Sequence, residues 1–161
     1  MLYQKLLKPI LFRFDPERVH NIFVFYGELL GGFWPTRKLI SLGLNYQNKK
    51  LTQTLQGITF LNPIGLSAGF DKDARLMRIM PAIGFGFEEV GSITGESCTG
   101  NPRPRLWRLP QHKSIVVNYG LKNIGCTAVA KKLAGKKFAF PLGINVAKTN
   151  CLETVDTCAG I

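Results

Sequence analysis

Three polar side chains, each at or near the end of a short apolar run, are the best candidates for chemistry in this chain. Lys72 ends the run Asn62–Lys72, which is apolar in its first half and a turn of small residues in its second. Ser92 lies near the end of a second run, and Asn145 near the end of a third. If these runs are parallel strands of an α/β barrel, the three side chains meet on the face that carries the active site in such folds. The alternative is an ordinary βα turn with a solvated lysine.

The residue types around Lys72 indicate what such a face could bind. Ser67, Ala68 and Gly69 have almost no side chain, so a flat ligand could lie directly on their backbone. Lys72 would present a compact positive charge to that ligand. A flavin ring uses such partners, because it needs hydrogen-bond donors to its carbonyl oxygens and a cation near its pyrimidine edge. The pattern suits a flavin without being specific to one.

Periodicity predicts the elements that position these residues. Residues 1–50 read as helices, with a start signal at Asp15-Pro16-Glu17 and a stop at Gly31-Gly32. Residues 51–61 predict a hairpin around Gln56-Gly57. Further along, the pattern predicts strands in the first half of 62–72, at 87–93 and at 140–146, an extended pair at 105–109 and 114–118, and helices at 75–80 and 126–133. Pro81 is expected to end or kink the first of these helices, and the alternation of strand and helix predicts a parallel sheet in an α/β fold.

Composition narrows the classes of function. The 161 residues carry a formal charge of +11, which favours anionic partners. The basic residues are scattered, so nucleic-acid binding is not expected, and the cysteines and histidines show no metal-ligand spacing. No apolar run is long enough to span a bilayer. The helical region 1–50 mixes aromatic, apolar and basic residues, which is typical of an element at a membrane surface. A helix pair packed on the chain's own core is the alternative.

Four motifs in the same order resemble dihydroorotate dehydrogenase: Asn62–Lys72, Gly84–Thr94, Gly100–Leu109 and Gly143–Asn145. The helical preface with Asp15–His20 resembles the quinone-dependent, membrane-associated class 2 of that family. The resemblance implies that residues 51–161 are the N-terminal part of an FMN-binding (β/α)8 TIM barrel. Residues 1–50 would be a helical extension that meets the membrane and the quinone. It also implies a peripheral protein on the cytoplasmic face of the bacterial inner membrane.

In this family, FMN takes a hydride from dihydroorotate to give orotate, a step of pyrimidine (UMP) biosynthesis, and passes electrons to a quinone. The resemblance implies FMN contacts at Ala68, Gly69, Phe70, Asp71, Lys72, Ser92 and Asn145. It implies substrate contacts at Lys72, Asn118, Tyr119, Gly120 and Leu121, and a quinone tunnel lined by His20 and Arg108. Ser92 stands where the family usually has threonine, and it keeps the hydroxyl.

The chain departs from the family pattern in its substrate loop. The family usually reads Asn-Arg-Met-Gly-Phe, whereas Val117–Leu121 reads Val-Asn-Tyr-Gly-Leu, with the asparagine displaced by one and Gly120 aligned. The family's serine base falls beyond Ile161, so the chain alone is expected to be inactive. A non-catalytic membrane-surface or quinone-binding module is the alternative function. A class that uses a soluble electron acceptor is disfavoured by the helical preface.

Overall fold

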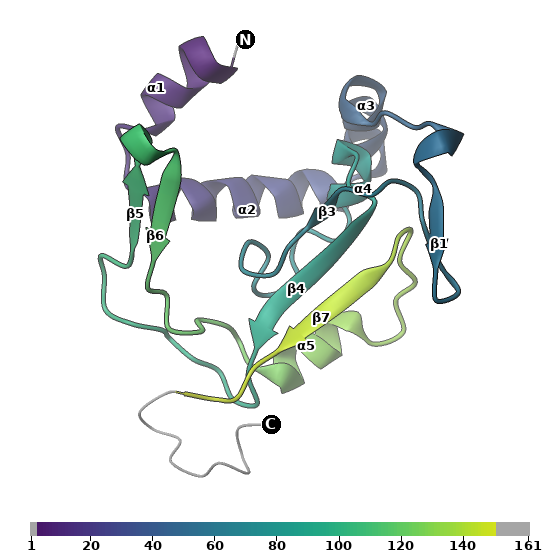
Figure 1. Cartoon of the computed structure of the whole chain (residues 1–161). Coiled ribbons are helices and arrows are strands. Elements are labelled where there is room, and N and C mark those ends of the chain that lie inside the picture. Colours follow the sequence, from purple (N-terminus) through teal and green to yellow (C-terminus); the bar gives the residue numbers. More distant parts are fainter. Residues whose placement is uncertain (1–2, 151–161) are drawn as a thin grey trace.

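The computed structural model describes residues 3–150, and its N-terminal third is helical, as predicted (Figure 1). The helices are η1 (Tyr3–Leu7, a π-helical turn), α1 (Lys8–Leu11), α2 (Pro16–Gly32) and α3 (Trp34–Leu44). The start signal of α2 is confirmed, because the Asp15 carboxylate accepts a hydrogen bond from the Arg18 backbone N–H at 2.8 Å. The helix ends at Gly32, as predicted.

A three-stranded parallel sheet, also predicted, forms the centre of the molecule. Its strands are β3 (Gly65–Leu66), β4 (Phe87–Ile93) and β7 (Leu142–Val146), in the order β3-β4-β7. Leu66 pairs with Glu88, and Glu88 with Leu142, so the three carboxyl ends point the same way. The crossovers carry α4 (Met80–Ile83) and α5 (Cys126–Leu133). The bounds of β4 and α5 are those predicted from the sequence.

Two antiparallel hairpins flank the sheet, and both were predicted. The first pairs β1 (Gln53–Leu55) with β2 (Ile58–Phe60) after the short helix η2 (Lys49–Leu51), and its turn residues Gln56 and Gly57 both have positive φ. The second pairs β5 (Leu106–Leu109) with β6 (Ser114–Val117) across η3 (Pro110–His112). This second hairpin stands beside the N-terminal end of α2 (Figure 1).

The predicted helix at residues 75–80 is wrong. The chain there forms a turn around the buried Asp71 carboxylate, which accepts the backbone N–H groups of Arg75 at 2.8 Å and Leu76 at 2.6 Å. Helix α4 begins only at Met80, so Pro81 lies in its first turn instead of ending a helix. Proline is tolerated there because the first N–H groups of a helix have no partner within it.

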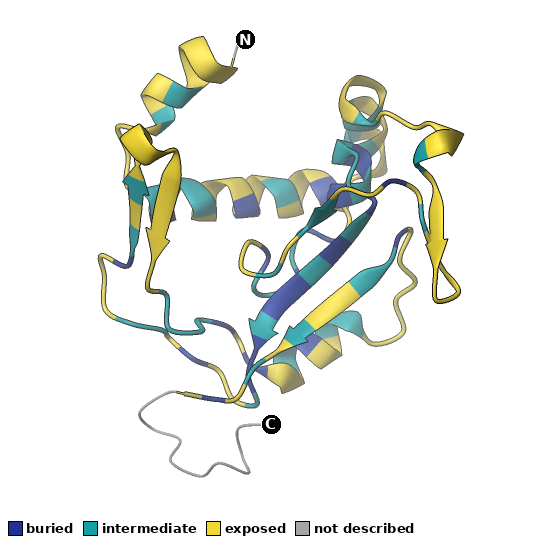
Figure 2. Ribbon diagram, in the orientation of Figure 1, coloured by how far each residue is buried: buried dark blue, intermediate teal, exposed yellow. Residues whose placement is uncertain are grey.

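The core lies on both sides of β4, the most buried strand in Figure 2. One cluster joins α2 to the turn before α4 and is made of Val24, Leu76, Ile79, Met80 and Phe140. A second joins β4 to α5 and is made of Ala74, Met77, Val90, Ile93 and Val129. Gly27 allows helix α2 to pack closely on this cluster, because a Cβ at that position would lie only 2.6 Å from Leu76 Cδ2. By contrast, β7 is an edge strand of the sheet within residues 3–150, and its Ile144 and Val146 are 50% and 65% exposed.

Candidate functional site

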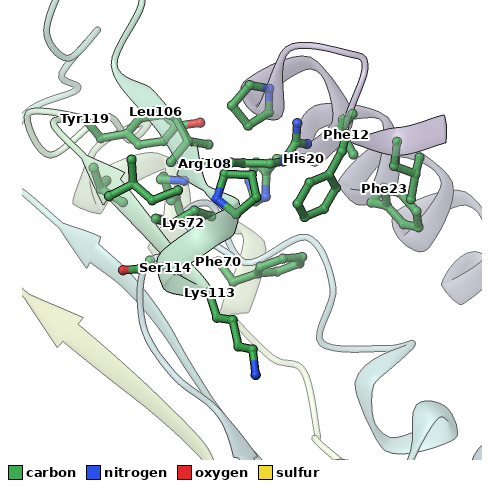
Figure 3. A pocket seen from close by; sticks show the side chains of 18 of the residues that line it. Phe12, His20, Phe23, Phe70, Lys72, Leu106, Arg108, Lys113, Ser114 and Tyr119 are labelled. Atoms are coloured by element: carbon green, nitrogen blue, oxygen red, sulfur yellow. The ribbon is translucent and has the colours of Figure 1, made fainter. Parts of the chain in front are cut away.

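A cleft of about 1060 Å³ lies between the N-terminal helices, the β5–β6 hairpin and the carboxyl end of β4 (Figure 3). Many of the residues expected to bind ligands line it together: His20, Gly69, Phe70, Lys72, Ser92, Arg108, Tyr119 and Leu121. The other expected residues do not line it, namely Ala68, Asp71, Asn118, Gly120 and Asn145. The structure therefore places some of the expected FMN residues, some of the expected substrate residues and both expected quinone residues around one space.

The charge of this cleft is one-sided. Its basic lining residues are Lys8, Lys72, Arg108, Lys113 and Lys122, and no aspartate or glutamate is among the lining residues. Towards α1 and α2 the wall becomes apolar, with Leu11, Phe12, Val19 and Phe23. Such a space suits an anionic ligand at its basic part and an apolar one at its helical part.

The floor of the cleft is built from the loop after β3 and the end of β4. Gly69 N–H donates to the Gly91 carbonyl at 2.8 Å, and Gly91 N–H donates to the Asp71 carbonyl at 3.1 Å. Gly69 has a φ of +102°, and no atom lies within 4 Å of where a Cβ would stand. The backbone there is open to the cleft, so a flat ring could approach it closely. These residues fit the flavin that the resemblance implies.

Ser92 and Asn145 meet across the neighbouring strands β4 and β7. Ser92 Oγ donates a short hydrogen bond to Asn145 Oδ1, and Asn145 Nδ2 donates to Glu89 Oε1 at 3.0 Å. The expected convergence of strand-end side chains is therefore seen: Ser92 lines the cleft and Asn145 supports it from behind.

Asp71 points into the core, where it is 1% exposed and holds the turn described above. Beneath it on β4 lies Glu88, which is fully buried and has no hydrogen-bond partner for either carboxylate oxygen among residues 3–150. Burial, followed by the nearby negative charge of Asp71, raises the pKa of Glu88 to about 8. The buried Glu88 side chain therefore keeps its proton at pH 7.

Lys72 extends towards Tyr119, with its ammonium 4.0 Å from the centre of the tyrosine ring. Burial, and after it the charge of Lys122, lowers the pKa of Lys72. Burial also raises the pKa of Tyr119 to about 12, so its phenol stays neutral. The Tyr119 hydroxyl is buried and has no hydrogen-bond partner in the described part of the chain, which leaves it available to a ligand.

Sequence reasoning missed the buried ion pair between Glu17 and Arg105. Glu17, expected only as an acid near the positive end of the α2 dipole, accepts from Arg105 Nη2 at 2.8 Å and from Nε at 3.1 Å. Both side chains are 4% exposed. Their hydrogen bonds lower the pKa of Glu17 and raise that of Arg105. The two residues are 88 positions apart in the sequence. The only sequence signal for their pairing was therefore that each of two separate motifs contains a charged residue of opposite sign.

His20 and Arg108, the expected quinone-tunnel residues, line the helical part of the same cleft. The His20 ring contacts the Phe70 ring edge to face, with centroids 4.8 Å apart. Burial, followed by the charge of Lys72, lowers the pKa of His20 to about 4, so its imidazole is neutral at pH 7. Arg108 donates to the Phe14 carbonyl at 2.7 Å and lies over the Phe12 ring, which ties β5 to the segment before α2.

The displaced asparagine of the expected substrate loop, Asn118, does not line the cleft. Asn118 Oδ1 accepts from Asn101 Nδ2 at 2.8 Å, and the residue is exposed. Gly120 has a φ of +68°, and a Cβ there would lie 2.5 Å from Asn101 Oδ1. The loop therefore needs glycine at this position, and it presents Tyr119 and Leu121 to the cleft instead of Asn118.

Comparison with known proteins decides the family. A profile of dihydroorotate dehydrogenase matches residues 50–160. The chain belongs to the dihydroorotate dehydrogenase family. It is 39% identical over 158 residues to the dihydroorotate dehydrogenase (quinone) of Rhodococcus erythropolis, covering 98% of this chain and 44% of that protein. It is 41% identical over 146 residues to that of Acidithiobacillus ferrooxidans, covering 89% of this chain and 40% of that protein. The chain thus spans less than half the length of these relatives.

Solved dihydroorotate dehydrogenases share the fold. A crystal structure of the Eimeria tenella enzyme in complex with ferulenol matches with a TM-score of 0.68 and 29% identity, over 88% of this chain and 38% of that one. The ligand-free form from the same organism matches with a TM-score of 0.59 and 29% identity, over 81% and 39% of the two chains. The predicted fold class, an α/β chain that forms the N-terminal part of a dihydroorotate dehydrogenase barrel, is confirmed by this likeness.

Proposed function

We propose that this chain supplies the Lys72 side of the FMN site, together with the quinone entrance, of a dihydroorotate dehydrogenase (quinone). The observation that carries the proposal is the single cleft that joins Lys72 and Ser92 to His20 and Arg108. Its basic part, free of acidic lining residues, suits the negative charge of dihydroorotate and of a reduced flavin. Its apolar part suits a quinone ring.

The roles of the residues follow from their positions. FMN, when bound, supplies the acceptor for the hydride of dihydroorotate. Gly69 offers an open backbone for the ring, and Lys72 places a positive charge beside the ring and the substrate. Ser92, held by Asn145, keeps a hydroxyl at the floor of the cleft. Tyr119 and Leu121 line the substrate side.

The helical extension, residues 1–50, would carry the quinone side. His20 and Arg108 line the apolar part of the cleft, and a neutral His20 adds no charge against an apolar ligand. Helices α2 and α3 expose many large apolar side chains, among them Phe23, Phe25, Leu29, Trp34 and Leu42. This surface favours peripheral attachment to a membrane, which we place at the cytoplasmic face of the bacterial inner membrane. Within residues 3–150, no helix is long and apolar enough to cross a bilayer.

A second candidate function is a non-catalytic membrane-surface or quinone-binding module. The exposed apolar helices favour it, and they would serve it without FMN. The barrel part, residues 51–161, would then be a scaffold only. The open edge of β7 argues for the first function, because a sheet with an unpaired strand is typical of a barrel that further strands complete.

The test joins this chain to the remaining length of the Rhodococcus erythropolis relative, because the chain covers 44% of that protein. The enzyme function predicts a yellow protein whose flavin absorbance falls with dihydroorotate and returns with a quinone. Lys72→Met is expected to lose this response, whereas Lys49→Met, on η2 outside the cleft, is the matched control. A colourless protein that still sediments with vesicles would support the second function, provided that this sedimentation is lost when residues 1–50 are removed.

A further inference from the structure

Four side chains from four separate segments form a continuous series of contacts that runs from a buried ion pair to the wall of the cleft. Glu17 comes from the first turn of α2, Arg105 from the loop before β5, Tyr119 from the loop after β6, and Lys72 from the loop after β3. Glu17 and Arg105 are joined by two hydrogen bonds of 2.8 and 3.1 Å. The Arg105 guanidinium lies 4.8 Å from the centre of the Tyr119 ring, and the Lys72 ammonium lies 4.0 Å from it. The tyrosine ring is therefore shared by two cations.

Arg105 cannot change its orientation without breaking several bonds. Its Nε and Nη2 donate to Glu17, and its Nη1 donates to the carbonyl groups of Thr99 and Asn101, each at 2.9 Å. The side chain is 4% exposed, so water does not replace these partners. A guanidinium fixed in this way gives the Tyr119 ring one defined surface to pack against.

Lys72 has no ion-pair partner among the described residues, in contrast to Arg75, Arg103 and Arg105. After burial, the charge of Lys122 lowers the pKa of Lys72 most, while Asp73 and Glu17 act in the opposite direction without forming an ion pair with it. The face of an aromatic ring attracts an ammonium, and more strongly where both are shielded from water. Among the described contacts, the Tyr119 ring is thus the group that lies directly against the Lys72 ammonium.

We propose that Tyr119 is a positioning residue for Lys72, and that the Glu17–Arg105 ion pair fixes Tyr119. The position of helix α2 is thereby coupled to the position of the Lys72 side chain in the cleft. The same helix carries His20 in the quinone part of the cleft, so one element sets both parts. The value of this coupling for catalysis rests on the proposed function, which gives Lys72 its task; the coupling itself does not depend on flavin or substrate.

The test is a nuclear magnetic resonance measurement on the chain without cofactor. Protons above an aromatic ring resonate upfield, so the ε-methylene protons of Lys72, assigned by Lys72→Arg, are expected to be shifted upfield of those of the other lysines. Tyr119→Leu is expected to abolish this shift. Tyr119→Phe is expected to keep it, because the tyrosine hydroxyl has no partner in the described part of the chain.

Coupling to α2 is tested through Glu17. Glu17→Gln is expected to reduce the upfield shift, because it loosens Arg105. Arg103→Gln is the matched control: it removes the other, 60% exposed partner of Glu17 and is expected to leave the shift intact. An unchanged shift in Tyr119→Leu would overturn the proposal, and so would equal losses in Glu17→Gln and Arg103→Gln. If Glu17→Gln unfolds the chain, as seen by circular dichroism, the pair of Tyr119 variants decides alone.

Discussion

The substitution Glu88→Gln tests whether the buried Glu88, close to the Asp71 carboxylate after β3, is protonated in the fold. Between pH 4.5 and pH 8 the folded chain holds a proton on Glu88 that the unfolded chain has released, because folding raises its pKa from 4.5 to about 8. The free energy of unfolding therefore falls as the pH rises through this window. At about 1.4 kcal/mol per pKa unit, the loss is on the order of 4 to 5 kcal/mol. A loss of this size is a large part of the stability of an ordinary domain.

The assay is urea unfolding of the two chains at a series of pH values. At about pH 5 the variant and the wild type are expected to be equally stable, because the glutamine amide is neutral, as the protonated acid is. At about pH 8 the variant is expected to be more stable by on the order of 4 kcal/mol. Glu89→Gln, next along the strand and bonded to Asn145, is the matched control and keeps the wild-type slope. If the pH dependence of Glu88→Gln equals that of the wild type, Glu88 is ionised in the fold and the reasoning is refuted.

Three further predictions concern the N-terminal helices. Glu17→Gln is expected to lower the free energy of unfolding by about 3 to 5 kcal/mol, because it leaves Arg105 buried without its charge partner. Arg103→Gln is expected to lower it by less than about 1 kcal/mol. Equal losses of the two variants, measured by urea unfolding, would contradict the burial argument. Asp15→Ala removes the N-cap of α2 and is expected to cost about 1 kcal/mol in thermal unfolding; an unchanged midpoint would show that the cap contributes nothing. His20 is expected to titrate near pH 4 by nuclear magnetic resonance, with stability rising from pH 4 to 6.5 as the unfolded state loses its proton; a midpoint near 6.5 would place the ring in water.

The sequence predicted the elements that have strong local patterns. Helix α5 follows a glycine and has apolar residues at helical spacing, β4 is a short run with glycines before and within it, and the Gln56-Gly57 hairpin has turn residues that tolerate positive φ. In place of the helix expected at 75–80, the chain forms a turn around the Asp71 carboxylate, with Ala74 at a φ of +53°, and helix α4 begins only at Met80. Spacing of apolar residues does not record such a local backbone conformation.

The site was predictable only as far as its motifs reach. The motifs named Lys72, Ser92 and Asn145, and the structure brings these three near one another. The Glu17–Arg105 pair joins segments 88 residues apart, so its existence depends on how the extension packs on the β5–β6 hairpin. The adjacent acids Glu88 and Glu89 read alike in the sequence, yet the first is sealed in the core and the second bonds Asn145. Side-chain direction along a strand alternates, and only the fold decides which face is inside.

The most direct measurement of the central claim is the visible spectrum of the chain joined to the remaining length of a relative. We predict flavin absorbance that dihydroorotate removes and that a quinone restores. In Lys72→Met, we predict that dihydroorotate no longer removes this absorbance. A folded protein that stays colourless when FMN is added back would contradict the assignment of the cleft. A yellow protein whose spectrum ignores dihydroorotate in both wild type and Lys72→Met would contradict the role given to Lys72.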